Sequence, residues 1–280
     1  MAHEEFLNIG CGPVFLSDSR WLNVDLNGDG RLVKPITLKG LLSQGYAGSF
    51  KGVYSSHVIE HLSVKDGKLF FSECSSLIQP GGYLRIVTPD FDSLVDNYIC
   101  ARDDGDMGRA KLEKLLLLEQ CVRSTPGGRF RQSISDLYVD YGREYIANIE
   151  RSRIGEALCD GKHVPLENTF KSKTLGSTVL RFWRRNRKRM NRTWFRTLRL
   201  LIPHNYKSNV LTTEPGERHL WIYSSNELDE MAQSAGFKRV ATVGFDISCG
   251  FVEEDIRFLD VREGKPRKGG HSMFVEYQKV

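Results

Sequence analysis

Residues 6–13 read FLNIGCGP, and residues 21–25 read WLNVD. The first stretch is an apolar run that ends in two glycines, and the second is an apolar run closed by a carboxylate. Glycines after a strand let the backbone turn sharply and approach a ligand closely, because no Cβ stands in the way. An acid at the end of the next strand can accept two hydrogen bonds from a ribose diol. The two stretches therefore predict a Rossmann-like α/β fold with a nucleoside-type cofactor.

The spacing of this pattern argues against a dinucleotide. A dinucleotide loop needs G-x-G-x-x-G with a pyrophosphate on the following helix. Here the third glycine position is Phe15, and Asp25 follows Gly12 by 13 residues, which leaves little room for a full helix and a strand. S-adenosylmethionine has no phosphate and fits this loop better. The alternative interpretation of the glycines is an ordinary turn after a strand.

The composition is that of a globular protein. The chain has 280 residues, of which 40% are hydrophobic and 27% charged, enough for one large core or for one core with an insertion. Six scattered cysteines contain no C-x-x-C pair, so we expect reduced thiols and neither a disulfide frame nor a zinc site. The sequence shows no secretory pattern and no run of about 20 apolar residues. We therefore expect a cytoplasmic protein, with peripheral binding to the inner face of the membrane as an option.

The hydrophobic pattern predicts a core formed by both ends of the chain. A helix is expected over residues 63–78, ended by residues 80–82 (PGG), and another within residues 224–235, with Ser225 as its cap and Gly236 at its end. The region from 91 to 218 shows helical stretches, at 111–122 and 134–149, and no strand series. We therefore expect a Rossmann-like cofactor-binding core at 1–92 and 213–280 and a helical, substrate-selecting insertion at 93–212. The expected strands are residues 6–9, 21–25, 32–36, 52–56, 83–87, 237–243 and 273–278.

Four sequence blocks in a fixed order make the prediction more specific. The chain resembles the class I S-adenosylmethionine-dependent methyltransferases, and within them a small bacterial group with LNxGCG, NVDL, SSHVLEHL and PGGxLRIxxPD blocks. The resemblance covers residues 6–90 and 217–280, a little over half of the chain. The corresponding blocks are residues 7–12 (LNIGCG), 23–26 (NVDL), 54–62 (YSSHVIEHL) and 80–90 (PGGYLRIVTPD).

The resemblance implies a seven-stranded sheet whose last strand is antiparallel, with the cofactor across the carboxyl ends of the strands. Gly10 and Gly12 would pack against the methionine part and ribose, and Asp25 would hold the ribose hydroxyls. The group often has an acid near the adenine after the third strand, but residues 31–36 (RLVKPI) contain none. The full set of implied cofactor-binding residues is Asn8, Gly10, Cys11, Gly12, Asp25, Leu26, Ser56 and His57.

Methyl transfer to a hydroxyl also needs a base that removes its proton. Four residues are candidates for catalysis: His57, His61, Asp90 and His219. Each has a structural alternative, since His61 with Glu60 could cap and pack a helix, Asp90 could cap a turn, and His219 could be a satisfied core residue. No Asp/His cluster has metal-ligand spacing, so the sequence predicts no metal.

Residues 180–199 carry nine Lys or Arg side chains and no acid. Aromatic and apolar residues recur near helical spacing, which is typical of a basic amphipathic helix. Three interpretations remain open: a solvated face whose aromatics dock on the core, an interfacial helix on an anionic membrane, or a surface for nucleic acid or a sugar nucleotide.

The most favoured function is O-methylation of a glycan or glycan precursor, because relatives of the bacterial group often occur in such pathways. The acceptor would be a glycan, a lipid-linked sugar or a sugar nucleotide. The main alternative is a degenerate methyltransferase fold that acts as a membrane- or nucleic-acid-binding module. An RNA methyltransferase is less favoured, because the Asn/Asp-Pro-Pro-Tyr motif of many base N-methyltransferases is missing.

Overall fold

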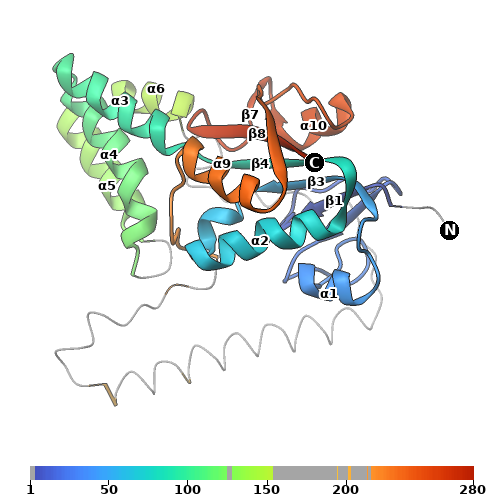
Figure 1. Ribbon diagram of the computed structural model, residues 1–280. Coiled ribbons are helices and arrows are strands. Elements are labelled where there is room, and N and C mark those ends of the chain that lie inside the picture. Colours follow the sequence, from blue (N-terminus) through green and yellow to red (C-terminus); the bar gives the residue numbers. More distant parts are fainter. Residues whose placement is uncertain (1–3, 125–127, 154–193, 195–200, 203–212, 214–215) are drawn as a thin grey trace.

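A six-stranded sheet forms the centre of the protein (Figure 1). The computed structural model describes residues 4–124, 128–153, 194, 201–202, 213 and 216–280. The strand order is β2-β1-β3-β4-β8-β5. The strands are β1 (Phe6–Ile9), β2 (Trp21–Val24), β3 (Phe50–Ser56), β4 (Ile78–Pro89), β5 (Phe237–Thr242) and β8 (Ser272–Lys279).

The strand directions confirm the expected α/β class. β1 pairs in parallel with β2 and β3, and β3 pairs in parallel with β4. The final strand, β8, lies between β4 and β5 and is antiparallel to both, as expected. The carboxyl ends of β1, β2, β3 and β4 therefore meet at one edge of the sheet, where open α/β folds place their ligands.

The expected strand at residues 32–36 is not formed, so the sheet has six strands and not seven. A single parallel bridge between Val24 and Lys34 is all that marks its position. The Asp29 carboxylate accepts hydrogen bonds from the backbone N–H groups of Arg31, Leu32 and Val33, which holds this segment as a turn. A side chain that satisfies backbone donors locally competes with strand pairing.

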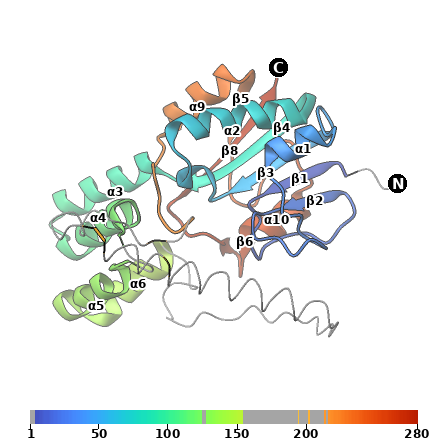
Figure 2. The same ribbon diagram turned by 90° about the horizontal axis from the view of Figure 1, so that it is seen from below.

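Helices cover both faces of the sheet (Figures 1 and 2). On one face lie α1 (Leu38–Ser43), α2 (Val64–Leu77) and α9 (Ser225–Ser234). On the other lies α10 (Glu253–Asp260), followed by the hairpin of β6 (Val261–Arg262) and β7 (Lys265–Pro266), none of which the sequence pattern predicted. Alternate residues of each strand point to opposite faces, so Leu7 enters the first core and Phe6 the second.

A group of helices from the described part of the chain stands to one side of the sheet (Figures 1 and 2). They are α3 (Phe91–Asp103), α4 (Met107–Val122), α5 (Phe130–Tyr141) and α6 (Arg143–Arg153), and the last three share a small apolar cluster around Leu112 and Ile146. The prediction of a single helix at residues 134–149 is wrong. Gly142, at φ 91°, breaks it into α5 and α6.

Two further boundaries differ from the sequence prediction. The PGG stretch at 80–82 does not end a helix, because α2 stops at Leu77 and β4 already begins at Ile78, which pairs with Phe50. The N-cap of α9 is Ser224 and not Ser225. The Ser224 hydroxyl accepts from the Glu227 N–H and the Glu227 carboxylate accepts from the Ser224 N–H, which forms a capping box.

A buried ionic network connects β4 to β8, to β3 and to the end of α10. Arg85 is fully buried, with its guanidinium 3.0 Å from the Asp260 carboxylate and 2.7 Å from that of Glu276. The Tyr54 hydroxyl also donates to Asp260, at 2.6 Å. This network connects β3, β4, β8 and the end of α10, so it fixes the strands whose carboxyl ends carry the site.

Candidate functional site

The loop after β1 has the backbone that only glycine adopts easily. Gly10 has φ 62° and Gly12 has φ 52°, both in the left-handed region. A Cβ on Gly10 would lie 2.4 Å from Cγ2 of Val58, in the turn that follows β3. The glycine loop and this turn are therefore packed directly against each other at the carboxyl edge of the sheet.

Asp25 lies at the end of β2 and faces the same loop. One of its carboxylate oxygens accepts from the Gly12 N–H at 3.1 Å, and the other accepts from the Asn27 N–H at 2.7 Å. A carboxylate has about four acceptor positions, so two remain for a ligand. Asp25 thus fixes the loop and still has acceptors for two hydroxyl groups.

The other sequence-predicted cofactor residues surround this loop. Asn8 is buried, and its amide donates to the Val14 carbonyl and to the Asn23 side chain. These hydrogen bonds hold the loop in position against β2. Leu26 follows Asp25 with 74% of its surface exposed, and Ser56 is the last residue of β3. Their contact with a cofactor stays a prediction.

Cys11 lies between the two glycines and is buried. Burial, with a smaller contribution from the charge of Asp25, raises the pKa of its thiol to about 12. Since the thiolate is the reactive form, Cys11 should be alkylated at least ~100-fold more slowly at pH 8 than the exposed Cys100. Timed iodoacetamide labelling with peptide mass mapping measures both rates, and equal rates would contradict this environment.

His57 follows β3 with φ 54°, an unusual left-handed conformation for a residue with a Cβ. Its backbone N–H donates to the Val87 carbonyl at 2.8 Å, which holds the turn against β4. Its ring nitrogens lie 2.9 Å from Glu60 Oε1 and 3.1 Å from Ser272 Oγ. Each ring nitrogen therefore has a polar protein atom close by, the Glu60 carboxylate for Nδ1 and the Ser272 hydroxyl for Nε2.

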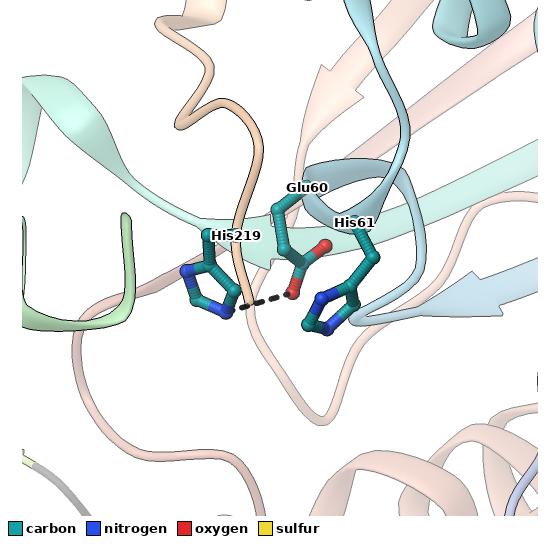
Figure 3. A group of neighbouring side chains, drawn as sticks. All are labelled: Glu60, His61 and His219. Atoms are coloured by element: carbon teal, nitrogen blue, oxygen red, sulfur yellow. Dashed lines mark ion pairs between the residues drawn. The ribbon is translucent and has the colours of Figure 1, made fainter. Parts of the chain in front are cut away.

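Three of the four catalytic candidates gather around Glu60. Glu60 and His61 lie in the one-turn 3₁₀ helix η1 (Ile59–His61), and His219 comes from the segment that leads into α9. Figure 3 shows the Glu60 carboxylate between the two imidazole rings, with His219 Nε2 4.0 Å from Glu60 Oε1. The rings of His61 and His219 meet edge to face, with centroids 4.9 Å apart.

The electrostatics of this group follow from its burial. Burial alone would raise the pKa of Glu60, but the imidazoles of His57, His219 and His61 outweigh it and hold the pKa well below its usual range. Burial lowers the pKa of His219 to about 4, so this ring is neutral near pH 7. Glu60 is therefore a carboxylate that stays ionised although it is fully buried.

Asp90, the fourth candidate, has a structural role of its own. It is the N-cap of α3, and its carboxylate accepts from the Ser93 N–H at 3.1 Å. Burial raises its pKa. It lies at the carboxyl end of β4, on the same edge of the sheet as the histidines.

Sequence reasoning passed over Glu60, which it treated as a helix cap. The backbone carbonyl of Glu60 accepts from the N–H groups of Leu220 and Trp221, so this residue also anchors the segment that carries His219. The signal was present in residues 57–61 (HVIEH), whose polar positions 57, 60 and 61 share one side of a helical turn.

No family model matches the chain, and neither does any curated protein. Solved structures do match it. One is a SAM-dependent methyltransferase from Archaeoglobus fulgidus, which is 23% identical in sequence. The match covers 35% of this chain and 53% of the Archaeoglobus chain, with a TM-score of 0.27. Another is PKMT2 from Rickettsia typhi in complex with AdoHcy, which is 11% identical in sequence. The match covers 99% of this chain and 49% of the PKMT2 chain, with a TM-score of 0.39. The chain thus spans about half the length of these two proteins.

A third match is phosphoethanolamine N-methyltransferase 2 from Haemonchus contortus in complex with S-adenosyl-L-methionine. It is 15% identical and covers 52% of this chain and 41% of that one, at a TM-score of 0.21.

The basic segment 180–199 lies outside the described residues, apart from Trp194, so its three interpretations stay open. Among the residues that the structure describes, no helix is long and apolar enough to cross a membrane.

Proposed function

We propose that this protein is an S-adenosylmethionine-dependent methyltransferase that acts on a hydroxyl oxygen of a glycan or glycan precursor. The observation that carries the proposal is the glycine cradle. Gly10 and Gly12 take left-handed backbone at the end of β1, and the Gly12 N–H is bonded to the Asp25 carboxylate at the end of β2.

The residues of this cradle fit the cofactor. A Cβ on Gly10 would collide with Val58, whereas nothing lies within 4 Å of the position of a Cβ on Gly12, so the loop is open to a ligand beside Gly12. The remaining acceptor positions of Asp25 suit the two hydroxyls of a ribose. No acid follows in residues 31–36, so the adenine ring would be held by other contacts.

When bound, S-adenosylmethionine would supply an activated methyl group: the acceptor oxygen would bond to the methyl carbon while the carbon–sulfur bond breaks and its electron pair stays on sulfur. The chain's part is to orient the acceptor and remove its proton. Correct orientation alone can contribute roughly 7–11 kcal/mol. His57, His61, Asp90 and His219 all lie at the carboxyl edge of the sheet, where an acceptor would meet the cofactor.

The class of acceptor is the least direct part of the proposal. It rests on the resemblance of the four sequence blocks to a bacterial group that is often found in glycan pathways. The helices α3 to α6 follow directly after β4 in the chain. This position supports the proposal that they select the substrate. In a cytoplasmic enzyme, the basic segment at 180–199 would suit a lipid-linked or phosphorylated acceptor at an anionic membrane.

Asp25→Ala should weaken the binding of S-adenosylhomocysteine by about 30-fold, since hydrogen bonds to a charged group are worth ~2 kcal/mol. Isothermal titration calorimetry of the full chain measures the affinity. Asp18→Ala is the matched control, because Asp18 pairs with Arg20 on the surface and should leave the affinity unchanged. If neither product nor cofactor binds the wild type at millimolar concentration, the degenerate binding module becomes the better account.

A further inference from the structure

We propose that Glu60, His61 and His219 form a binding site for one divalent transition-metal ion. The binding itself follows from the geometry of these side chains. Its role in catalysis, set out below, rests on the proposed methyl transfer. The sequence predicted no metal, because His219 lies far from the other two along the chain.

The three ligand atoms already converge. One donor atom from each residue lies within 4.8 Å of the other two. Ligands of a tetrahedral zinc ion stand about 3.3 Å apart, given a metal–ligand distance of about 2.0–2.1 Å. Small rotations of two imidazoles and one carboxylate would close this gap. Two histidines with one glutamate are also the ligands of a known class of catalytic zinc site.

A backbone contact orients His61 as a metal ligand. Its Nδ1 lies 2.9 Å from the Arg218 carbonyl oxygen. A carbonyl only accepts hydrogen bonds, so Nδ1 carries the proton and Nε2 keeps a free lone pair. Metal-bound histidines are held in this way, with the second ring nitrogen donating to a carbonyl or carboxylate. The carbonyl belongs to the residue next to His219, so the second ligand helps to position the first.

The buried polar atoms of the cluster are incompletely satisfied. Glu60 is fully buried and His219 is 7% exposed. His219 Nδ1 has no hydrogen-bond partner, and Glu60 Oε1 lies 2.9 Å from His57 Nδ1 without the alignment of a hydrogen bond. Buried polar groups in native proteins are normally paired, and buried charges are paired or bind metals.

The charge of the cluster also favours a cation. Among the described residues, the ion pairs of Glu60 are with His57 and His219, and none is with a lysine or arginine. Lys268 also interacts electrostatically with Glu60, although no ion pair between the two is found among the described residues.

The ligand set selects the kind of ion. Imidazole suits zinc and its neighbours in the first transition row, whereas magnesium and calcium prefer oxygen ligands. Three protein ligands leave at least one position open. His61 is only half-buried, so the open side can reach solvent or substrate.

The proposed ion would stand beside the methyl-transfer site. The turn that carries Glu60 and His61 also carries Val58, which touches Gly10 of the cofactor cradle. An acceptor hydroxyl bound to the ion would lose its proton more easily, as metal-bound water does. This favours an alcohol or a vicinal diol over an amine as the methyl acceptor.

Zn²⁺ titration of the purified, metal-stripped full chain tests the site, with Co²⁺ absorption as a readout of the ligand geometry. We expect one tight site in the wild type, no comparable binding of Mg²⁺, and affinity at least tenfold weaker in His61→Ala and His219→Ala. Cys100→Ser and Cys249→Ser should bind as the wild type does, because these exposed thiols are outside the cluster. Circular dichroism shows whether each variant is folded. If a histidine-to-alanine variant is not folded, His61→Gln is titrated in its place.

Equal Zn²⁺ affinity in the wild type and in the folded histidine variants would overturn the metal site, as would a wild type without a tight site. Titration with S-adenosylhomocysteine, in the absence of metal, separates this outcome from the proposed function. Product binding without Zn²⁺ binding overturns the metal site alone. Zn²⁺ binding that depends on both histidines supports the site even if the product does not bind.

Discussion

Gly10→Ala is expected to weaken S-adenosylhomocysteine binding by about 100-fold. The new Cβ would lie 2.4 Å from Val58 Cγ2, so either the loop or the turn after β3 must move. The backbone at φ 62° adds a second cost for any residue with a side chain. A left-handed residue costs roughly 1–2 kcal/mol and overpacking about 1–3 kcal/mol. The free loop relieves this strain by leaving the binding conformation, so product binding has to restore ~3 kcal/mol of it, which is about two orders of magnitude in affinity. Calorimetry with the full chain measures the change.

Gly48→Ala is the matched control for this substitution. Gly48 has the same φ of 62°, but nothing lies within 4 Å of the position of its Cβ. It therefore carries the backbone cost without the clash, and it lies in the loop before β3, away from the glycine cradle. Gly48→Ala should lose stability and keep its affinity. Equal affinity in Gly10→Ala and the wild type would mean that the loop does not form the cofactor site.

Arg85→Met is expected to lower the free energy of unfolding by about 3–5 kcal/mol. The substitution removes the cation that neutralises both Asp260 and Glu276, and it leaves two carboxylates buried without a counter-charge. Removing one partner of a buried ion pair is costly for this reason, even where the intact pair adds little net stability. Urea unfolding followed by circular dichroism measures the change.

Arg257→Ala serves as the control for Arg85. Arg257 pairs with Glu253 across one turn of α10, and both side chains are more than half exposed. Exposed pairs of this kind contribute about 0.3–0.5 kcal/mol. A loss at Arg85 no larger than the loss at Arg257 would show that the buried network does not hold β3, β4 and β8 together.

Local sequence patterns were sufficient to predict most strands of the central sheet. Apolar runs predicted β1, β2, β3, β4, β5 and β8, and glycine, proline or an acid marked the ends of several of them, because strand burial and turn chemistry are both visible over a few residues. The missing third strand shows the limit of this reasoning. Residues 32–36 have strand-like composition, but the Asp29 carboxylate binds the backbone donors that pairing would need.

The site was predictable only in part, for a related reason. The glycines and Asp25 lie within 20 residues of one another, so their contact could be expected from two adjacent strands. The group around Glu60 could not, because His219 reaches it only when the Glu60 carbonyl binds the segment before α9. Arg85 is similar: its partners come from α10 and β8, and no local pattern reveals that an arginine inside a strand will be buried.

The central claim is that the glycine cradle binds S-adenosylmethionine, and a crystal structure with S-adenosylhomocysteine tests it most directly. The account predicts product density against Gly10 and Gly12, with both ribose hydroxyls on the Asp25 carboxylate and the sulfur toward the turn at His57. A well-occupied product elsewhere on the protein, or a cradle free of density in crystals soaked at millimolar product, would contradict it.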